Sequence, residues 1–395
     1  MNRMMRPFRL LSLWAAISGT ALALSGCGAP AVPTLSFPDV ADVPFSTVSV
    51  GAGLSVGLGG YGSSMAYRAQ DSTFWLLTDR GPNVDGPVPD SKVFLLPSFT
   101  PRIGVFKLRG DSLRLERQIL LADSVGGPFC GLPDTAGPGA TGETAYDRDL
   151  HPIGQTRHPG IDPEGLALLP DGTFWVSDEY GPYLLHFDRD GRCLEKLAPG
   201  RGLPASYAHR RPNRGMEGLC ASADGNTLYS IMQSPLAEPG HSPLSACLPL
   251  MALRPAEGNL RQYAYPLDNA ANGVSELAYA GHDTLLVLER DGAFPESGKG
   301  FKRVYRVTLT HADPSRPLRK ELLVDLLKAI PGYDHDKPEG LALIGDSILA
   351  VANDDDFGVT SERGGVAVAK LKRDGQPDRN RIYFVRLHKR APHVH

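Results

Sequence analysis

The sequence predicts an all-β protein, a β-propeller of five to six four-stranded blades. Two observations favour this fold. Glycine (44) and proline (34) make up about a fifth of the 395 residues, against roughly 12% in average proteins, and so many of them break long helices. One unit of two short apolar strands joined by a tight turn recurs along the chain. A β-sandwich also has many short strands, but it does not predict a glutamate that recurs with the repeat.

Each repeat consists of an apolar strand, a polar turn and a second apolar strand. The turns contain the residues that short hairpins need, such as Asp171-Gly172 and Asp224-Gly225. The first copy lacks the glutamate that the other four carry in their first strand. The five copies are Ser64–Arg80, Asp162–Glu179, Met216–Ile231, Val274–Arg290 and Pro338–Asp354.

Further strand candidates follow each repeat and would complete four-stranded blades. Third strands are expected at Ile103–Leu108, Tyr183–Phe187, Leu248–Leu253, Val304–Leu309 and Val366–Leu371. Outer strands are expected at Leu113–Leu121, Leu194–Leu197 and Leu322–Leu326. A sixth blade could lie in Phe45–Leu58; alternatively, that stretch pairs with Ile382–Leu387 and closes a ring of five.

The N-terminus resembles a bacterial lipoprotein signal peptide. Three arginines precede the apolar run Leu10–Leu24, which is too short to span a bilayer comfortably. The run ends in Leu24-Ser-Gly-Cys27, which resembles a lipobox, so we expect cleavage before Cys27 and a lipid on its thiol. The alternative is an ordinary secretory signal with an incidental cysteine. Gly28 after the cysteine favours the bacterial outer membrane.

This pattern divides the chain into a signal peptide (1–26), a tether (27–44), a propeller domain (45–388) and a C-terminal tail (389–395). No later segment has eighteen uninterrupted apolar residues, so we expect the lipid to be the only link to a membrane and the domain to be extracytoplasmic. The net charge of −3 leaves no broad cationic surface, which argues against nucleic acid as a partner.

Four cysteines remain in the mature chain. An even number in an oxidising compartment predicts two disulfides, and three pairings are possible. We favour Cys220–Cys247 with Cys130–Cys193. The absence of a C-x-x-C pair makes metal binding by these cysteines improbable.

The repeat places its carboxylates at one end of each blade. In a hairpin the start of the first strand lies beside the end of the second, so Glu164 shares one end with Asp178 and Glu179. First strands line the central channel of a propeller, so such acids should gather at one mouth of it. The long connections fall at the same end, and function on a rigid scaffold resides in such loops. The residues expected there are Glu164, Asp178, Glu179, Glu217, Glu276, Glu289, Glu339, Asn353, Asp354, Asp355 and Asp356.

Carboxylates that share a cavity repel each other, so protons, basic side chains or a cation must neutralise some of them. An all-oxygen set suits a hard ion, and outside the cell we expect Ca²⁺. Four basic residues near the same end would neutralise acids or bind an anionic substrate: Arg80, Arg214, Arg290 and Lys337. The structural alternative is a ring of glutamates bonded to backbone amides of neighbouring blades. The expected metal ligands are Glu164, Glu217, Glu276, Glu339, Asp178 and Asp355.

Six short motifs mark the ends of these strands: Asp79-Arg-Gly-Pro-Asn83, Gly160-Ile-Asp-Pro-Glu-Gly-Leu-Ala167, Gly215-Met-Glu-Gly-Leu219, Val287-Leu-Glu-Arg290, Pro338-Glu-Gly-Leu-Ala342 and Asn353-Asp-Asp-Asp-Phe357. As a set they resemble the phytase-like family described as "esterase-like activity of phytase". The resemblance covers about Val48 to Leu387. It implies an exported, propeller-like protein with a phosphoester or ester hydrolase role.

The function that these features predict is a hydrolase of small phosphate esters or other anionic esters at the acidic mouth. Ca²⁺ would polarise the phosphoryl oxygen, Arg80 and Arg290 would bind substrate oxygens, and Glu179 or Glu289 would accept a proton. Two alternatives stay open. One is a surface lipoprotein whose propeller binds a carbohydrate or protein partner without catalysis; the other is a propeller lactonase.

Overall fold

The computed structural model describes residues 36–387 except 52, 136, 155–157, 238–245, 297–298 and 363–365. The expected signal peptide, the lipidation site Cys27 and the expected tail lie outside the described residues. Contacts divide the chain into two units, residues 1–37 and 38–395, and the account below concerns the second. In the part of the chain that the structure describes, no helix is long and apolar enough to cross a membrane.

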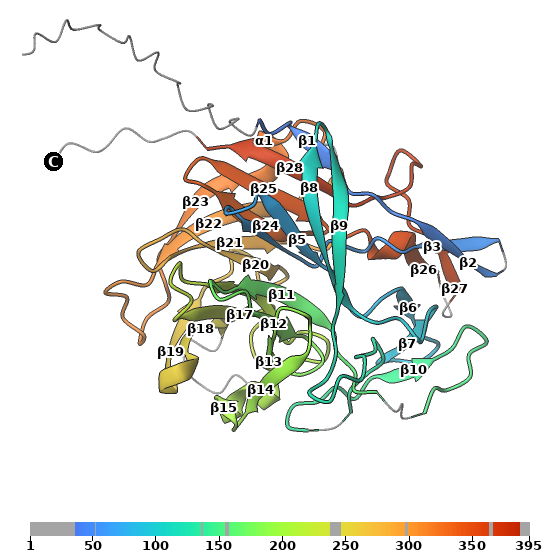
Figure 1. The fold of residues 1–395 in the computed structure, drawn as a ribbon, viewed down its shortest axis with the longest axis horizontal. Coiled ribbons are helices and arrows are strands. Elements are labelled where there is room, and N and C mark those ends of the chain that lie inside the picture. Colours follow the sequence, from blue (N-terminus) through green and yellow to red (C-terminus); the bar gives the residue numbers. More distant parts are fainter. Residues whose placement is uncertain are drawn as a thin grey trace, which may run out of the picture. The chain divides into compact units, whose positions relative to one another are not determined.

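The described part of the second unit is a β-propeller of five four-stranded blades (Figure 1). Blade 1 contains β4 (Ser64–Arg68), β5 (Thr73–Leu77), β8 (Arg102–Arg109) and β9 (Ser112–Leu120). Blade 2 contains β11 (Pro163–Leu168), β12 (Phe174–Asp178), β13 (Tyr183–Phe187) and β14 (Cys193–Pro199). Blade 3 contains β16 (Met216–Ala221), β17 (Leu228–Met232), β18 (Leu248–Arg254) and β19 (Asn259–Tyr265).

Blade 4 contains β20 (Gly273–Tyr279), β21 (Thr284–Arg290), β22 (Lys302–Thr308) and β23 (Lys320–Asp325). Blade 5 combines both ends of the unit: β24 (Pro338–Ile344), β25 (Ile348–Asn353), β28 (Arg381–Arg386) and β1 (Val40–Asp42). A short helix, α1 (Leu326–Ala329), follows β23. The prediction of an all-β propeller is confirmed.

The five blades form a closed ring. Their inner strands β4, β11, β16, β20 and β24 contact one another in that cyclic order, and β24 contacts β4 again. The N-terminal strand completes the last blade, because β1 runs antiparallel to β28 with Val40 opposite Tyr383. One parallel pair, Asp42 with Ser112, then joins β1 to β9, so blades 5 and 1 form one eight-stranded sheet.

The ring closes differently from the expectation. Phe45–Leu58 does not pair with β28; it contains the separate hairpin β2 (Thr47–Gly51) and β3 (Leu54–Gly57). Val366–Leu371 is not the third strand of its blade, because β27 (Val366–Ala369) pairs with β26 (Val359–Glu362) and β28 takes that place. Strands in a blade and in an inserted hairpin have similar apolar patterns, so the pattern alone could not separate them.

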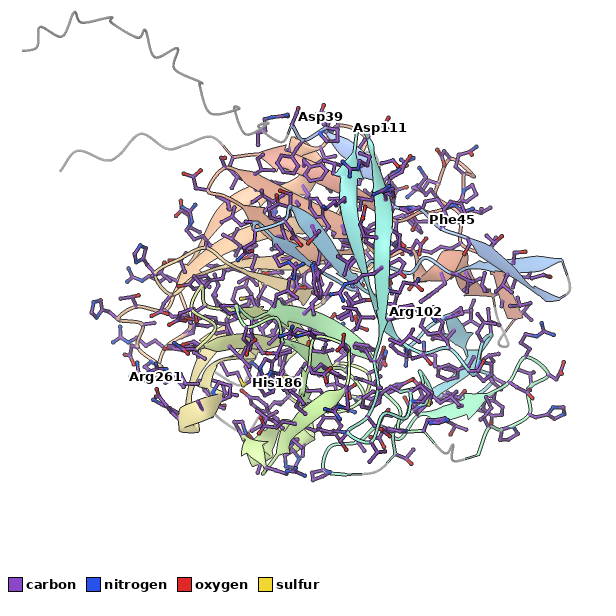
Figure 2. All side chains as sticks on the ribbon, in the orientation of Figure 1. Asp39, Phe45, Arg102, Asp111, His186 and Arg261 are labelled. Atoms are coloured by element: carbon purple, nitrogen blue, oxygen red, sulfur yellow. The ribbon has the colours of Figure 1, made fainter. Side chains whose placement is uncertain are left out.

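Insertions form an annex beside the ring, which we define as β2, β3, β26 and β27 together with β6 (Asn83–Asp85), β7 (Ser91–Phe94) and β10 (Thr144–Tyr146). β26 contacts β6, and β27 contacts β3. Figure 1 shows these small strands together on the right. Figure 2 labels Phe45 on the approach to β2, where the guanidinium of Arg379 lies 3.8 Å from its ring centre. Residues of β6, β7 and β26 line the cavity described below, so the annex borders the site.

Apolar side chains fill the spaces between neighbouring blades. The middle strands β5, β12 and β17 are buried along their whole length, since both faces of a blade pack against other blades. Trp75 of blade 1 meets Phe174 of blade 2 edge to face, with 6.4 Å between ring centres. A single blade could not bury both of its faces alone, so the ring provides the core that holds the site.

The described cysteines form no disulfide, so the predicted bridges are wrong. Cys220 lies on β16, opposite Tyr229 of β17, which in turn lies opposite Ala252 of β18. Cys247 precedes Ala252 by five residues along the chain and is therefore displaced along the blade as well as across it. Two strand spacings already amount to about 10 Å, whereas a disulfide needs Cα atoms within about 7 Å of each other.

The second expected bridge fails because its two cysteines pack in different places. Cys130 lies in a cluster with Phe94, Leu132 and Ala145 at the annex. Cys193 starts β14 and packs in the core between blades 1 and 2. Both thiols are buried, and each donates a weak hydrogen bond to a backbone carbonyl oxygen, Cys130 to that of His158 and Cys193 to that of Glu195.

Candidate functional site

Three glutamates are positioned by bulges in the inner strands. The ladder between the first and second strands is interrupted between Pro163 and Gly165, between Met216 and Leu219, and between Pro338 and Gly340. Glu164, Glu217 and Glu339 occupy these interruptions. A bulge adds a residue to one strand and redirects a side chain, which is why bulges are common beside binding sites. All three glutamates line one cavity.

A residue at the end of the second strand, or one to three positions after it, also faces this cavity in all five blades. Side chains alternate along a strand, so the preceding residue usually points into the blade instead. Glu179 therefore faces the cavity while Asp178 does not, and Arg290 faces it while Glu289 does not. The cavity-lining residues at this position are Arg80, Glu179, Gln233, Arg290 and Asp354.

The cavity has a volume of about 530 Å³ and is lined mostly by polar groups. Of the residues predicted for the site, the structure brings seven together there: Glu164, Glu179, Glu217, Glu339, Arg80, Arg214 and Arg290. Other charged residues also line it: Asp79, Asp85, Asp336, Asp354, Asp356, Lys92 and Lys337. Carboxylates outnumber basic side chains in the lining.

Glu276 lies apart from the cavity lining. It occupies the position that Gly165, Gly218 and Gly340 fill in other blades, and its side chain is 1% exposed. Its carboxyl group accepts hydrogen bonds from the backbone N–H groups of Leu219 at 3.0 Å and Leu277 at 2.8 Å, and from the hydroxyl of Ser64. Burial raises its pKa well above the usual range. Glu276 therefore connects blades 1, 3 and 4 through hydrogen bonds. This is the structural role that the sequence analysis left open for the glutamates, bonded to backbone amides of neighbouring blades.

Glu289 is also absent from the cavity lining and is completely buried. Lys320 Nζ lies 2.6 Å from one carboxylate oxygen, and the hydroxyl of Tyr265 donates to the same oxygen at 3.0 Å. The other oxygen accepts from the backbone N–H of Asp268 at 2.9 Å and from the side-chain amide of Asn272 at 3.0 Å. With both oxygens engaged, Glu289 holds the loop before β20 rather than a substrate.

Asp178 and Asp355 stabilise turns behind the cavity. One Asp178 oxygen accepts from the backbone N–H groups of Asp162 and Tyr180, both at 3.0 Å. Asp355 accepts from the backbone N–H of Phe357 at 3.1 Å. Burial raises the pKa of each carboxyl to about 7.

Most basic side chains at the cavity are neutralised by neighbours. Arg80 lies 3.0 Å from Glu143 and 3.4 Å from Asp162. Arg290 pairs with Glu339. Lys337 lies 2.6 Å from Asp356, and Lys370 lies 2.7 Å from the same residue. Although burial alone would raise the pKa of Asp356, these two ammonium groups lower it.

Arg214 differs from these bases. It is exposed, and it forms no ion pair with any residue that the structure describes. The next residue, Gly215, packs closely against the backbone of Glu179, so its loop lies against the acidic wall. A Cβ at Gly215 would lie only 2.5 Å from the carbonyl oxygen of Glu179. Gly273 faces the guanidinium from the other side and leaves room for it. Arg214 is therefore the cation at this mouth that remains available to a ligand.

The acids at the centre of the cavity have raised pKa values. Burial, together with the charges of Asp162 and Glu217, raises the pKa of Glu164 well above the usual range. Burial and the charge of Glu217 do the same for Glu179. Burial and the charge of Glu339 raise the pKa of Glu217 to about 8. Glu217 therefore retains its proton at neutral pH unless a cation replaces it.

Some buried oxygens in this wall have no donor. Glu217 Oε1 accepts from Gln233 Nε2 at 2.8 Å, but Glu217 Oε2 and Glu179 Oε1 have no hydrogen-bond partner among the described residues. Buried polar atoms usually have a partner, and in a polar cavity such a partner can be a water molecule or an ion. Groups of three acidic or histidine side chains close enough to share a metal ion occur twice among the described residues: Asp79, Asp162 and Glu164, and Asp147, Asp149 and His151.

The sequence carried signals for the residues that the prediction missed. Asp79 and Asp162 both belong to motifs already recognised, in which the neighbouring Arg80 and Glu164 drew attention instead. The first repeat lacks the recurrent glutamate, yet Asp79 supplies a carboxylate to the cavity from the end of its second strand. Gln233, at the position of an acid in the third repeat, acts as a donor to Glu217, which a carboxylate could not do.

Comparison with known proteins adds a family match. The model of the family "Phytase-like: Esterase-like activity of phytase" matches residues 56–357. An uncharacterized secreted protein of Arthroderma benhamiae is 31% identical over 238 residues, which cover 46% of this chain and 46% of that protein. The chain thus spans about half the length of this relative.

Similar solved structures include a calcium-binding protein, regucalcin, from Agrobacterium tumefaciens, at 13% identity with a TM-score of 0.38. That similarity covers 84% of this chain and 92% of the other. Virginiamycin B lyase from Staphylococcus aureus is 12% identical with a TM-score of 0.35, covering 74% of this chain and 77% of the other.

Proposed function

Because the chain belongs to the phytase-like family with "esterase-like activity of phytase", we propose that it hydrolyses phosphate esters or other small anionic esters in the cavity at the mouth of its propeller. The observation that supports this most is the composition of the cavity wall. Carboxylates from three inner-strand bulges and from strand ends meet there, several with raised pKa values, beside one unpaired arginine. Such a set offers proton transfer and anion binding within one cavity of substrate size.

The wall also fits a hard divalent cation such as Ca²⁺. Its donors are all oxygens, carboxylates exceed bases, and two buried carboxylate oxygens have no donor. Cavity carboxylates, Glu164 among them, would hold the ion. A bound cation would polarise the phosphoryl or carbonyl oxygen of the substrate and offset its charge. Glu276, Asp178 and Asp355 have structural partners and are left out of this ligand set.

Arg214 would bind the anionic group of the substrate. Arg80 and Arg290 each already face carboxylates, so binding a substrate would require breaking those pairs. Arg214 has no such pair to break, and its planar guanidinium matches phosphate or carboxylate with two parallel hydrogen bonds.

Glu217 and Glu179 would move the protons. With a pKa of about 8, Glu217 keeps its proton at neutral pH and can donate it to the leaving oxygen. Gln233 holds Glu217 Oε1, which leaves Oε2 to carry that proton. In its ionised form Glu179, whose pKa is also raised, is a stronger base than an ordinary glutamate and would accept a proton from the attacking water.

The test is turnover of p-nitrophenyl phosphate, phytate, carboxyl esters and lactones, with Ca²⁺ and with EDTA. Loss of two charge-assisted hydrogen bonds should raise KM by about tenfold or more in Arg214→Ala, with a smaller change in kcat. Arg211→Ala is the matched control, since Arg211 lies on the same exposed loop but does not line the cavity. Failure to turn over the whole panel with Ca²⁺ restored would favour a non-catalytic binding module instead.

We also propose that the protein is exported and anchored to the outer membrane through a lipid on Cys27, with no other membrane contact. The support is the lipobox-like N-terminus and the secreted relative. Expressed in a bacterium with a native lipoprotein pathway, the wild-type protein should fractionate with outer membranes. Cys27→Ser should appear in the soluble periplasm or retain its signal peptide; unchanged fractionation of the variant would contradict the anchor.

A further inference from the structure

Three carboxylates on the blade 1 and blade 2 side of the cavity converge on one point. One oxygen from each of Asp79, Asp162 and Glu164 lies within 4.8 Å of the other two. Two oxygens bound to the same Ca²⁺ at 2.3–2.6 Å can be separated by no more than about 5 Å. A single ion can therefore touch all three groups.

Short connections hold these carboxylates in place. Asp79 follows β5 and accepts a hydrogen bond from the backbone N–H of Gly81 at 2.7 Å. Asp162 precedes β11 and accepts from the backbone N–H of Arg80 at 3.2 Å. Glu164 projects from the β11 bulge. The positions come from the ends of strands in two neighbouring blades, which is a rigid base for a binding site.

The charges in this corner are not balanced. The guanidinium of Arg80 lies near both Asp162 and Glu143, and it is the cation that the structure places in ion pairs with them. No described residue donates a hydrogen bond to the carboxylate of Glu164. A divalent ion would offset the remaining like charges, which otherwise have to be relieved by protons.

A second observation points to a cation. Glu179 and Glu217 line the same cavity, are 5% and 2% exposed, and each has one buried carboxylate oxygen without a hydrogen-bond partner. Such oxygens can bind water molecules of an ion's shell or the ion itself. Two members of the carboxylate cluster, Asp79 and Glu164, line the same cavity as these unpartnered oxygens, and Asp162 lies behind them within 4.8 Å.

We infer that Asp79, Asp162 and Glu164 form a binding site for one hard divalent cation, Ca²⁺ or an ion of similar chemistry. This inference deepens the proposed function. Binding of the ion is independent of that function, and only the role of the ion in hydrolysis rests on it. Two of its ligands, Asp79 and Asp162, were not among the expected ones.

The other carboxylate group serves as a built-in comparison. Asp149 and His151 are exposed, and one oxygen of Asp147 already accepts from the backbone N–H groups of both residues at 2.9 Å. These bonds are those of a surface turn, and all its oxygens are within reach of water. Asp149→Asn therefore removes a carboxylate of equal charge from a site that should not bind the ion.

The experiment is isothermal titration of EDTA-treated protein with CaCl₂, paired with melting curves in EDTA and in Ca²⁺. Wild type and Asp149→Asn should bind one ion with similar affinity and gain melting temperature from Ca²⁺. Glu164→Gln and Asp79→Asn should bind about tenfold more weakly or not at all. In EDTA, Glu164→Gln should melt at or above the wild-type temperature because it removes a like charge, so its weak binding would not reflect unfolding.

The outcomes separate this inference from the proposed function. Wild-type affinity in both Glu164→Gln and Asp79→Asn, or loss of binding in Asp149→Asn, would overturn the inference. Hydrolysis that is indifferent to metal, in a protein that binds none, would also overturn it and leave the function standing. Binding as expected without hydrolysis of any ester would support the inference and remove the function.

Discussion

Glu217 and Glu276 are both buried glutamates on inner strands, yet their neighbours give them different roles. Glu276 receives three hydrogen bonds, two of them from backbone N–H groups, and its carboxyl is thereby fully used in holding blades together. Glu217 receives one side-chain hydrogen bond, from Gln233, and keeps one oxygen free of donors. The number of donors around a buried carboxyl therefore separates a structural acid from one that is available for chemistry.

The raised pKa of Glu217 predicts a pH-dependent stability. The unfolded residue loses its proton near pH 4.5 and the folded one near pH 8, so the folded state binds the extra proton between these values. This contribution to stability is present below the lower value and is lost as pH rises through the window. In EDTA, Glu217→Gln should therefore gain melting temperature relative to wild type as pH increases from 5 to 8.5.

Melting curves across this pH range, each measured for both proteins, provide the test. Gln cannot ionise, so the difference between the proteins should grow steadily with pH. A difference that is constant, or that has the opposite slope, would show that the proton on Glu217 is not bound more tightly in the folded state.

At the scale of the element, three inner strands, β11, β16 and β24, combine a cavity-facing glutamate with a glycine at the contact between blades. In β16 the bulge turns Glu217 toward the cavity, and the next residue, Gly218, lets β16 approach β20 of the next blade. A Cβ at Gly218 would lie 2.7 Å from the backbone nitrogen of Leu277. The recurrent Glu-Gly pair thus has two causes, one in the site and one in the contact between blades.

This close approach predicts a large cost for a small substitution. In Gly218→Ala the new methyl group meets backbone atoms that cannot rotate away, so overpacking should lower the free energy of unfolding by about 1–3 kcal/mol. Gly142→Ala is the control, since a Cβ there has no atom within 4 Å. Urea denaturation of both variants measures the difference, and equal stability would mean that the inner strands are less tightly packed than described.

At the scale of the whole molecule, the periodic features were predictable from sequence. Five copies of a strand–turn–strand unit indicated the five-bladed ring, because the residue preferences within each copy identify its two strands and its turn. The repeat also indicated that acids gather at one mouth, and Glu164, Glu217 and Glu339 do meet there. Local periodicity was sufficient for both inferences.

Two kinds of feature could not be predicted from local sequence patterns. One is the pairing of strands that are distant in the chain, and the other is which of two adjacent residues faces the cavity. Val40–Asp42 carries no sign that it completes a blade with residues 340 positions later. Glu289 and Arg290 are adjacent, but only the register of β21 decides which of them faces the cavity. The cysteines were paired from number and compartment alone, whereas their separation across β16 to β18 depends on the strand ladder.

The position of β1 in blade 5 has a consequence for biosynthesis. Its partner strand, β28, is the last of the described strands to leave the ribosome, so the nascent chain lacks the final pairing that closes the ring until synthesis is almost finished. Contacts between such distant segments form slowly, since a long loop must first be closed. Closure of the ring therefore waits until the last described strand has been made.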